Sequence, residues 1–249
     1  MFSRRPDKID FVIAGAQKSG TTALYYLLSA HPEIAFPTKQ ELHFFDDEDA
    51  FAGPVNYDAL HQQFALGRKT IVSGECTPIY LYWKPALGRI AQYNPRMKVI
   101  VTLRNPITRA FAHWNMQRHK KREPLDFMEA LRAEPARARE AASLQSRYFS
   151  YVDRGLYAGQ LERLFNLFPP EQITVIKFEE FQHDNPGTLH GLCDFLGVST
   201  LKSIAQKDRN VVPYEREMRD DEREYLRGIF RADISRVESI LGWDCSDWR

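Results

Sequence analysis

Groups that can take up a proton are concentrated in one short stretch of the sequence. Glu41, His43 and Asp46 stand in a run that also contains Phe44 and Phe45. In an extended segment Glu41 and His43 point to the same side, because side chains alternate along the backbone. Aromatic neighbours that exclude water raise the pKa of a carboxylic acid toward the range useful to a general base. The stretch therefore predicts a site that deprotonates a hydroxyl group.

A second candidate site is a glycine-containing loop that follows the apolar run of residues 9–15. The loop continues Ala-Gln-Lys-Ser-Gly-Thr-Thr, with Lys18 two places before Gly20. Glycine lets the backbone approach a phosphate, and the first amides of the following helix point at it with the positive end of the helix dipole. Thr21 and Thr22 add hydroxyl donors, and Lys18 adds a positive charge. These residues predict a cradle for an anion.

The glycines of this loop have the spacing of the nucleoside triphosphate P-loop, but that motif has lysine where this sequence has Thr21. The missing lysine argues against a triphosphate with bound magnesium, although a P-loop kinase stays open as one alternative. A non-catalytic nucleotide-binding protein is another alternative. The joint presence of Lys18, Glu41 and His43 weighs against it, because a binding module needs no base.

A third candidate follows the strongly apolar run of residues 98–103. Arg104 leaves the carboxyl end of this run, where α/β sheets bind their ligands. A guanidinium group is well suited to a phosphate monoester. Pro106 fits the first turn of the helix that follows. Arg109, further along that helix, is interpreted as a structural ion-pair partner.

These motifs together resemble the sulfotransferases that use PAPS (3′-phosphoadenylyl sulfate), in particular the branch of carbohydrate and bacterial small-molecule enzymes. The loop around Lys18 resembles the family's 5′-phosphosulfate loop. Residues 39–46 resemble its K-E-x-H-F-F-D run, with Gln40 inserted before Glu41. The Arg104 run resembles its 3′-phosphate motif R-x-P-x-x-R-x-x-S. Weaker matches at residues 154–162 and 223–243 extend the resemblance over nearly the whole chain.

The resemblance implies a reaction and a role for several residues. The reaction is in-line transfer of a sulfuryl group from PAPS to a hydroxyl or amine, without a metal, leaving 3′-phosphoadenosine 5′-phosphate. Glu41 is the general base, with His43 as the second choice, and Lys18 contacts the sulfonate and bridging oxygens. The implied donor-binding set is Gln17, Lys18, Ser19, Gly20, Thr21, Thr22, Arg104, the Ala112 position and Arg209.

Two departures from the family pattern bear on the ligands. Ala112 stands where the 3′-phosphate motif has serine, which removes one hydroxyl donor, and Lys207 and Arg209 are candidates to replace it. Cys76 stands where relatives in the glycan branch often have lysine, which counts against a polyanionic glycan as acceptor. The implied acceptor pocket contains Asp46, with Glu75 as a further candidate that could equally be a buried structural carboxylate.

The elements that position these residues follow from the hydrophobic pattern. Apolar runs predict strands at residues 9–15, 70–74, 98–103 and 172–178, and helical patterns predict helices at 19–30, 107–120, 124–139, 157–168 and 186–196. Strands that alternate with helices predict an α/β fold with a mostly parallel sheet, flanked by helices. No linker divides the chain, so residues 1–249 are predicted to form a single domain with a P-loop-like loop.

Composition limits the class of protein. The chain has 249 residues and a formal net charge of +1, which gives no reason to expect a nucleic-acid partner. Its three cysteines have neither metal-ligand nor disulfide-scaffold spacing, so we expect a reducing compartment. No signal sequence or membrane-spanning run is recognisable, and a cytoplasmic enzyme is predicted. A small molecule, a lipid, a carbohydrate, a polyketide or a peptide would each fit as acceptor, and the sequence does not indicate the oligomeric state.

Overall fold

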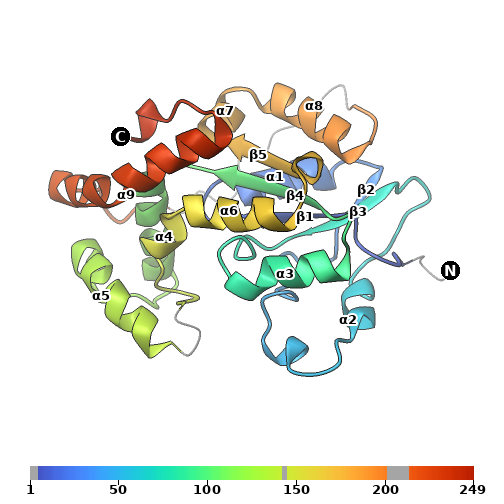
Figure 1. The fold of residues 1–249 in the computed structure, drawn as a ribbon, viewed down its shortest axis with the longest axis horizontal. Coiled ribbons are helices and arrows are strands. Elements are labelled where there is room, and N and C mark those ends of the chain that lie inside the picture. Colours follow the sequence, from blue (N-terminus) through green and yellow to red (C-terminus); the bar gives the residue numbers. More distant parts are fainter. Residues whose placement is uncertain (1–4, 142–144, 201–212) are drawn as a thin grey trace. The chain divides into compact units, whose positions relative to one another are not determined.

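The structure is a computed structural model that describes residues 5–141, 145–200 and 213–249. The chain divides into two compact units, Met1–Leu103 with Leu164–Arg209, and Arg104–Arg163 with Asn210–Arg249. The first unit contains the whole central sheet (Figure 1). That residues 1–249 form a single domain stays a prediction.

The central sheet has five strands in the order β2-β3-β1-β4-β5, and all the pairings between them are parallel among the described residues. Their bounds are β1 Phe11–Gly15, β2 Ile34–Ala35, β3 Val72–Cys76, β4 Lys98–Leu103 and β5 Ile173–Lys177. The predicted α/β fold with a parallel sheet is confirmed. Only β2 had not been predicted, because two residues are too few to show a pattern. Parallel pairing places the carboxyl ends of all the strands at one edge of the sheet.

Strand β1 is buried along its whole length, as an apolar run without alternation predicts. Phe11 and Ile13 lie in a core cluster with residues of helices α1 (Thr21–Ser29), α7 (Phe178–His183) and α8 (Asn185–Leu196). Val12 and Ala14, which point to the other face, are also fully buried. Gly74 of β3 makes room for this core, since a Cβ there would lie 2.5 Å from the ring of Phe11.

Three helices of the first unit had not been predicted: α7, α2 (Tyr57–His61) and α3 (Lys84–Tyr93). Helix α2 is too short for a periodic pattern. Helix α3 carries a readable signal, because a proline stands in its first turn and Ala86, Leu87 and Ile90 are buried at helical spacing. Its position after β3 provides the connection from that strand to β4.

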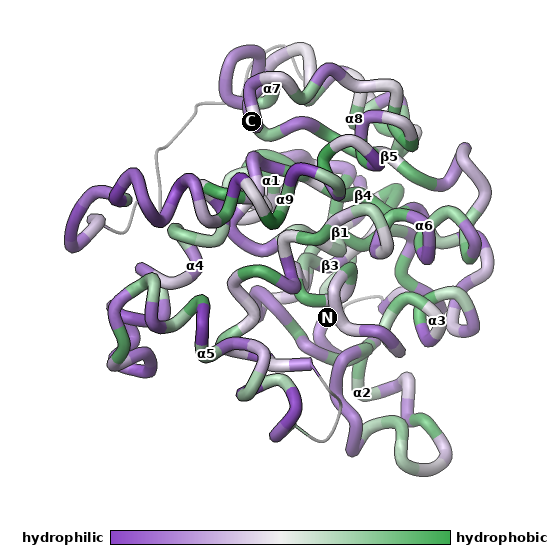
Figure 2. Tube along the Cα trace, turned by 60° about the vertical axis from the view of Figure 1, so that its left-hand side comes forward, coloured by the Kyte–Doolittle hydropathy of each residue, from purple (hydrophilic) through white to green (hydrophobic). Residues whose placement is uncertain are grey.

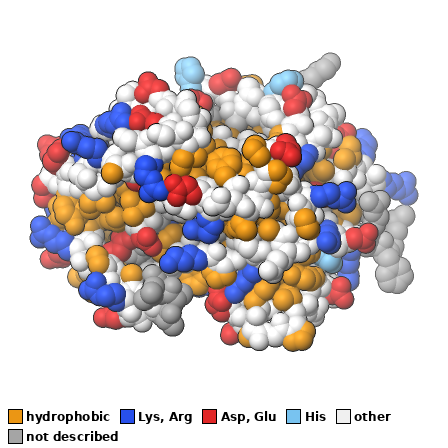
Figure 3. Space-filling model, viewed as in Figure 1, with side chains coloured by type: hydrophobic (Ala, Val, Ile, Leu, Met, Phe, Trp, Pro, Cys, Tyr) orange, Lys and Arg blue, Asp and Glu red, His pale blue; other side chains and the backbone are white. Residues whose placement is uncertain are grey.

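The second unit is helical, with α4 (Pro106–His119), α5 (Phe127–Glu140) and α9 (Asp220–Leu241); α6 (Ala158–Leu167) begins in it and ends in the first unit. Pro106 opens α4 as predicted, and the Asn105 side chain caps it by accepting from the Ile107 amide at 2.9 Å. Helix α9 is largely hydrophilic (Figure 2). None of the helices in the described ranges is long and apolar enough to cross a membrane. Figure 3 shows acidic and basic side chains interspersed on the visible face.

Candidate active site

The predicted anion loop connects β1 to α1 within the first unit. Lys18 and Gly20 have φ values of 71° and 86°, and α1 begins at Thr21 without a side-chain cap from the described residues. The first N–H groups of a helix have no acceptor within the helix, so this end can donate to a ligand. Ser19 is fully buried, and its Oγ has no hydrogen-bond partner in the described part of the chain. The loop therefore offers the donors that a bound anion needs.

Gly20 is the loop residue that we expect to tolerate substitution least. A Cβ at this position would lie 2.6 Å from the ring of Phe178, and a φ of 86° is strained for other residues. We expect Gly20→Ala to lower the free energy of unfolding by about 1–3 kcal/mol and to weaken binding of 3′-phosphoadenosine 5′-phosphate. Urea unfolding and calorimetric titration measure the two effects. Gly53→Ala is the matched control, because a Cβ there meets nothing within 4 Å; equal effects of the two substitutions would contradict the prediction.

The candidate acid–base residues lie between β2 and α2 of the same unit. The prediction that this segment is extended is wrong, because Glu41 and His43 have left-handed backbone conformations with φ values of 56° and 57°. The turn nevertheless brings the side chains together. His43 Nε2 lies 3.5 Å from Glu41 Oε2, and His43 Nδ1 lies 3.1 Å from both carboxylate oxygens of Asp46.

The two carboxylates determine the charge of His43. Hydrogen bonds to Asp46 and to Glu41 raise the pKa of the imidazole from 6.5 to about 9. His43 is therefore protonated at neutral pH and donates from both ring nitrogens. An imidazolium has no lone pair with which to accept a further proton.

This pKa shift gives a testable dependence of stability on pH. Because the folded-state pKa of His43 lies above its ordinary value, protonation stabilises the fold fully below about pH 6.5, and this contribution is lost as the pH rises through about 9. We expect His43→Gln to remove that part of the pH dependence. Denaturant unfolding of both proteins across this interval measures it, and parallel curves would show that the ion pairs contribute nothing.

The two carboxylates predicted for the acceptor pocket are buried. The side chain of Asp46 has no exposed surface, and Glu75 of β3 is likewise 0% exposed. Burial raises the pKa of Glu75 to about 7, although hydrogen bonds from the Tyr80 and Thr77 hydroxyls lower it. Glu41 and His43, by contrast, have side chains that are 37% and 45% exposed. A molecule that approaches from solvent therefore reaches Glu41 and His43 before either buried carboxylate.

Cys76, the last residue of β3, is buried and its thiol is not poised for reaction. Burial raises the pKa of this thiol, and its sulfur lies 3.8 Å from the Thr21 carbonyl oxygen as a weak donor. A thiol with a raised pKa is a poor nucleophile. The side chain also carries no positive charge.

Two residues in contact with the segment that contains Glu41, His43 and Asp46 were missed by the sequence analysis. The amide of His43 donates to Thr77 Oγ1 at 3.4 Å, and the amide of Phe45 donates to the Tyr80 hydroxyl at 3.3 Å. Thr77 directly follows β3 and Tyr80 comes shortly after it, so both lie near the carboxyl edge of the sheet. Their position after a predicted strand was the signal that could have identified them.

The remaining candidates belong to the second unit or lie outside the described residues. The Nε of Arg104 donates to Thr108 Oγ1 at 3.0 Å, and its carbonyl accepts from the Tyr157 hydroxyl at 2.9 Å. Ala112 is buried in α4. Arg109 is fully buried and donates to the Tyr151 carbonyl, in keeping with a structural residue. Lys207 and Arg209 lie outside the described residues.

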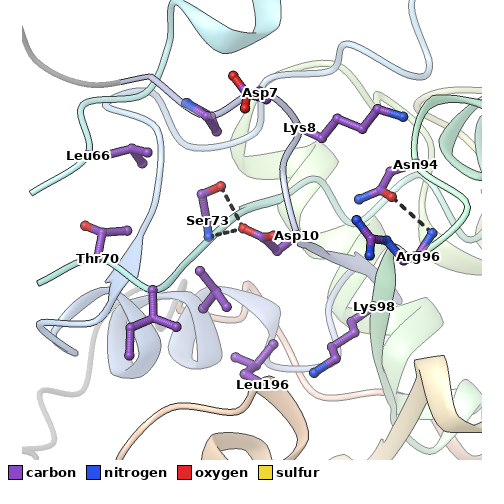
Figure 4. A pocket seen from close by; sticks show the side chains of 13 residues that line it. Asp7, Lys8, Asp10, Leu66, Thr70, Ser73, Asn94, Arg96, Lys98 and Leu196 are labelled. Atoms are coloured by element: carbon purple, nitrogen blue, oxygen red, sulfur yellow. Dashed lines mark hydrogen bonds between the residues drawn. The ribbon is translucent and has the colours of Figure 1, made fainter.

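A cavity of about 540 Å³ lies at the other edge of the sheet, where strands begin (Figure 4). Its lining includes Lys8 and Asp10 before β1, Ser73 in β3, and Arg96 and Lys98 at the start of β4. The Asp10 carboxylate accepts from the Ser73 amide at 2.7 Å and from its hydroxyl at 3.1 Å. Because the predicted site residues follow the carboxyl ends of the strands, this cavity is separate from the candidate active site.

Comparison with known proteins agrees with the site. A family model described as the sulfotransferase domain matches residues 8–211. The crystal structure of a sulfotransferase from Alicyclobacillus acidocaldarius superposes with a TM-score of 0.83 and 34% sequence identity, covering 98% of this chain and 100% of that one. The sulfotransferase domain of the curacin biosynthetic pathway, with a TM-score of 0.55 and 15% identity, shares the fold.

Curated relatives are longer proteins. Heparan sulfate glucosamine 3-O-sulfotransferase 3B1 of Mus musculus is 32% identical over 76% of this chain and 46% of its own length. Membrane-associated sulfotransferase kil1 of Dictyostelium discoideum is 24% identical over 94% of this chain and 65% of its own length. The chain thus spans between about half and two thirds of these relatives.

Proposed function

Because the chain belongs to the sulfotransferase family, we propose that it transfers the sulfuryl group of PAPS to a hydroxyl or amine, with Glu41 as general base. The chain is a sulfotransferase, and sulfuryl transfer from PAPS is the reaction of its family. The observation that carries the proposal is the approach of Glu41 to His43, at 3.5 Å, within the unit that also contains the anion loop.

The donor's sulfated end is proposed to bind the loop between β1 and α1. The buried hydroxyl of Ser19 supports this, since it has no hydrogen-bond partner among the described residues and an anion would supply one. The uncapped start of α1 supports it further. Lys18 is proposed to contact the sulfonate, and Arg104 the 3′-phosphate, as in the family motifs.

Glu41 is a better candidate for the base than His43. The raised pKa of His43, about 9, keeps its imidazole protonated at neutral pH and without a free lone pair. Glu41 is partly exposed and can reach an incoming acceptor. In this assignment His43 and Asp46 orient Glu41 by holding the imidazolium between the two carboxylates.

The proposed step forms one bond to sulfur and breaks another. The acceptor's oxygen or nitrogen attacks sulfur in line while its proton passes to Glu41. The bond between sulfur and the bridging oxygen breaks, and its electron pair leaves with 3′-phosphoadenosine 5′-phosphate. Lys18 and the amides of α1 stabilise the charge that builds on this oxygen. We propose that these groups supply the positive charge without a metal.

The acceptor is proposed to be a small molecule, a lipid or a carbohydrate. Some of the relatives are named for heparan sulfate. Cys76, which places an uncharged thiol where such enzymes often have lysine, favours a less anionic acceptor for this chain. A cytoplasmic location remains part of the proposal, and it rests on the pattern of cysteines.

Radiolabelled PAPS tests the proposal directly. The protein is incubated with labelled donor and a panel of alcohols, amines, sugars and lipids, and the label is followed into product. We expect transfer to at least one acceptor class, together with saturable binding of 3′-phosphoadenosine 5′-phosphate. Absence of both transfer and nucleotide binding would overturn the proposal, while binding without transfer would favour the non-catalytic alternative. The kinase alternative no longer has support, because the matched family is that of sulfotransferases.

A further inference from the structure

Glu75 is a buried carboxyl group for which the proposed reaction has no use. It lies next to the last residue of β3 and has no exposed surface. Burial of an ionisable group is unfavourable unless hydrogen bonds compensate for the lost water. The hydrogen bonds made by Glu75 therefore explain how the fold tolerates this buried carboxyl group.

The Thr77 hydroxyl donates to Glu75, with Thr77 Oγ1 2.8 Å from Glu75 Oε2. Hydrogen bonding from the Tyr80 hydroxyl lowers the pKa of Glu75, which burial has raised to about 7. Glu75 Oε1 has no hydrogen-bond partner among the described residues. A hydroxyl has a single proton to donate and lone pairs with which to accept. Once that proton is directed at Glu75, the lone pairs of each hydroxyl are free to accept from other donors.

Both hydroxyls accept hydrogen bonds from backbone amides of the same segment, residues 43–45. Thr77 Oγ1 accepts from the amide of His43 at 3.4 Å, and the Tyr80 hydroxyl accepts from the amide of Phe45 at 3.3 Å. Glu75 is thus linked to the catalytic segment along two parallel routes, each through one hydroxyl. Neither route includes a side chain that the reaction itself needs.

The backbone of this segment, residues 41–45, is strained. Glu41 and His43 both have positive φ values, 56° and 57°. Left-handed conformations of residues other than glycine are strained and persist only where the surroundings enforce them. The two amide hydrogen bonds at His43 and Phe45 fall within this part of the chain.

We propose that Glu75 is a positioning residue for catalysis: it orients the Thr77 and Tyr80 hydroxyls so that they anchor residues 43–45 and keep Glu41 in place. This inference rests on the proposed function, in which Glu41 is the base. It also assigns Glu75 a role other than contact with the acceptor, because Glu75 has no exposed surface.

Substitutions that keep shape but remove hydrogen bonding test the inference. Thr77→Val removes the hydroxyl, while Thr77→Ser retains it. With an acceptor identified through labelled PAPS, we expect Thr77→Val to lower kcat about tenfold with KM for PAPS unchanged, since the loss of one anchor costs about 1.4 kcal/mol at most. Thr77→Ser is expected to restore most of the rate. Glu75→Leu, which removes both oxygens that can accept from the hydroxyls, should lower kcat at least as much.

Tyrosine variants provide a matched pair. Tyr80→Phe removes the second anchor, whereas Tyr93→Phe removes another buried hydroxyl that accepts from the amide of Ile9 at 2.7 Å. We expect kcat to fall only in Tyr80→Phe, and the amide resonances of His43 and Phe45 to shift in the variants of Glu75, Thr77 and Tyr80 alone. Equal rates for Thr77→Val and Thr77→Ser, in a folded and active protein, would overturn the positioning role. An inactive wild-type protein would instead count against the proposed function.

Discussion

Glu41→Gln is expected to lower kcat by roughly 10²–10⁴-fold, the contribution of a positioned general base, with little change in the affinity for the nucleotide. The amide has the shape of the carboxylate but cannot accept a proton. Asp46, whose hydrogen bond is the largest cause of the raised pKa of His43, remains in this variant and still favours the protonated imidazole, which cannot accept the proton. Steady-state rates with labelled PAPS, together with binding of 3′-phosphoadenosine 5′-phosphate, measure the two quantities.

The control for this variant is Glu48→Gln. Glu48 is an exposed carboxylate of the same stretch that pairs with Arg89 at 2.6 Å, so the control changes charge nearby without touching the base. We expect a near-normal rate from it. A near-normal rate from Glu41→Gln would indicate that His43 is the base, and a rise of that variant's activity with pH as the imidazole loses its proton would identify the neutral imidazole as the acceptor of the proton.

Lys18→Ala is expected to lower kcat by roughly 10²–10³-fold, as loss of a group that stabilises charge in the transition state does. The left-handed backbone at this position, with φ of 71°, is equally strained for lysine and alanine, so the fold should be little affected. The readouts are the rate of sulfuryl transfer and the unfolding midpoint in urea.

Two comparisons separate a local effect of Lys18 from a general effect of charge. Lys18→Arg keeps the charge in the loop and should retain part of the activity. Lys69→Ala removes an exposed lysine that precedes β3, at the edge of the sheet opposite the loop, and should be neutral. If Lys69→Ala and Lys18→Ala lowered the rate alike, a direct contact between Lys18 and the sulfonate would be refuted.

Strands β1 and β4 were predictable because they are short, apolar and almost entirely buried on both faces. The run at residues 98–103 coincides with β4, and Pro106 opens α4 as its fixed φ favours. Strand β2 escaped prediction because a two-residue strand depends on pairing with β3, which only the folded chain reveals. Helix α3 was missed although its proline and its buried positions could have revealed it.

The sequence predicted which residue types form the site, but it did not predict the backbone conformation that brings them together. The proximity of Glu41 and His43 was expected from alternation along an extended chain, whereas the structure produces it with two left-handed residues. Glutamate has no local preference for that conformation, and histidine, although enriched in it, adopts it in only a small fraction of cases, so neither residue predicts it. The contacts of Thr77 and Tyr80 join segments far apart in the sequence, so a local pattern could not disclose them.

The contact of one imidazolium with two carboxylates has an electrostatic consequence for the reaction. With His43 protonated and both partners ionised, Glu41, His43 and Asp46 together carry one negative charge. Uptake of the proton released by the acceptor makes this trio electrically neutral. In the proposed reaction, proton transfer to Glu41 would therefore remove net charge from a partly desolvated region at the moment when negative charge moves away toward the departing nucleotide.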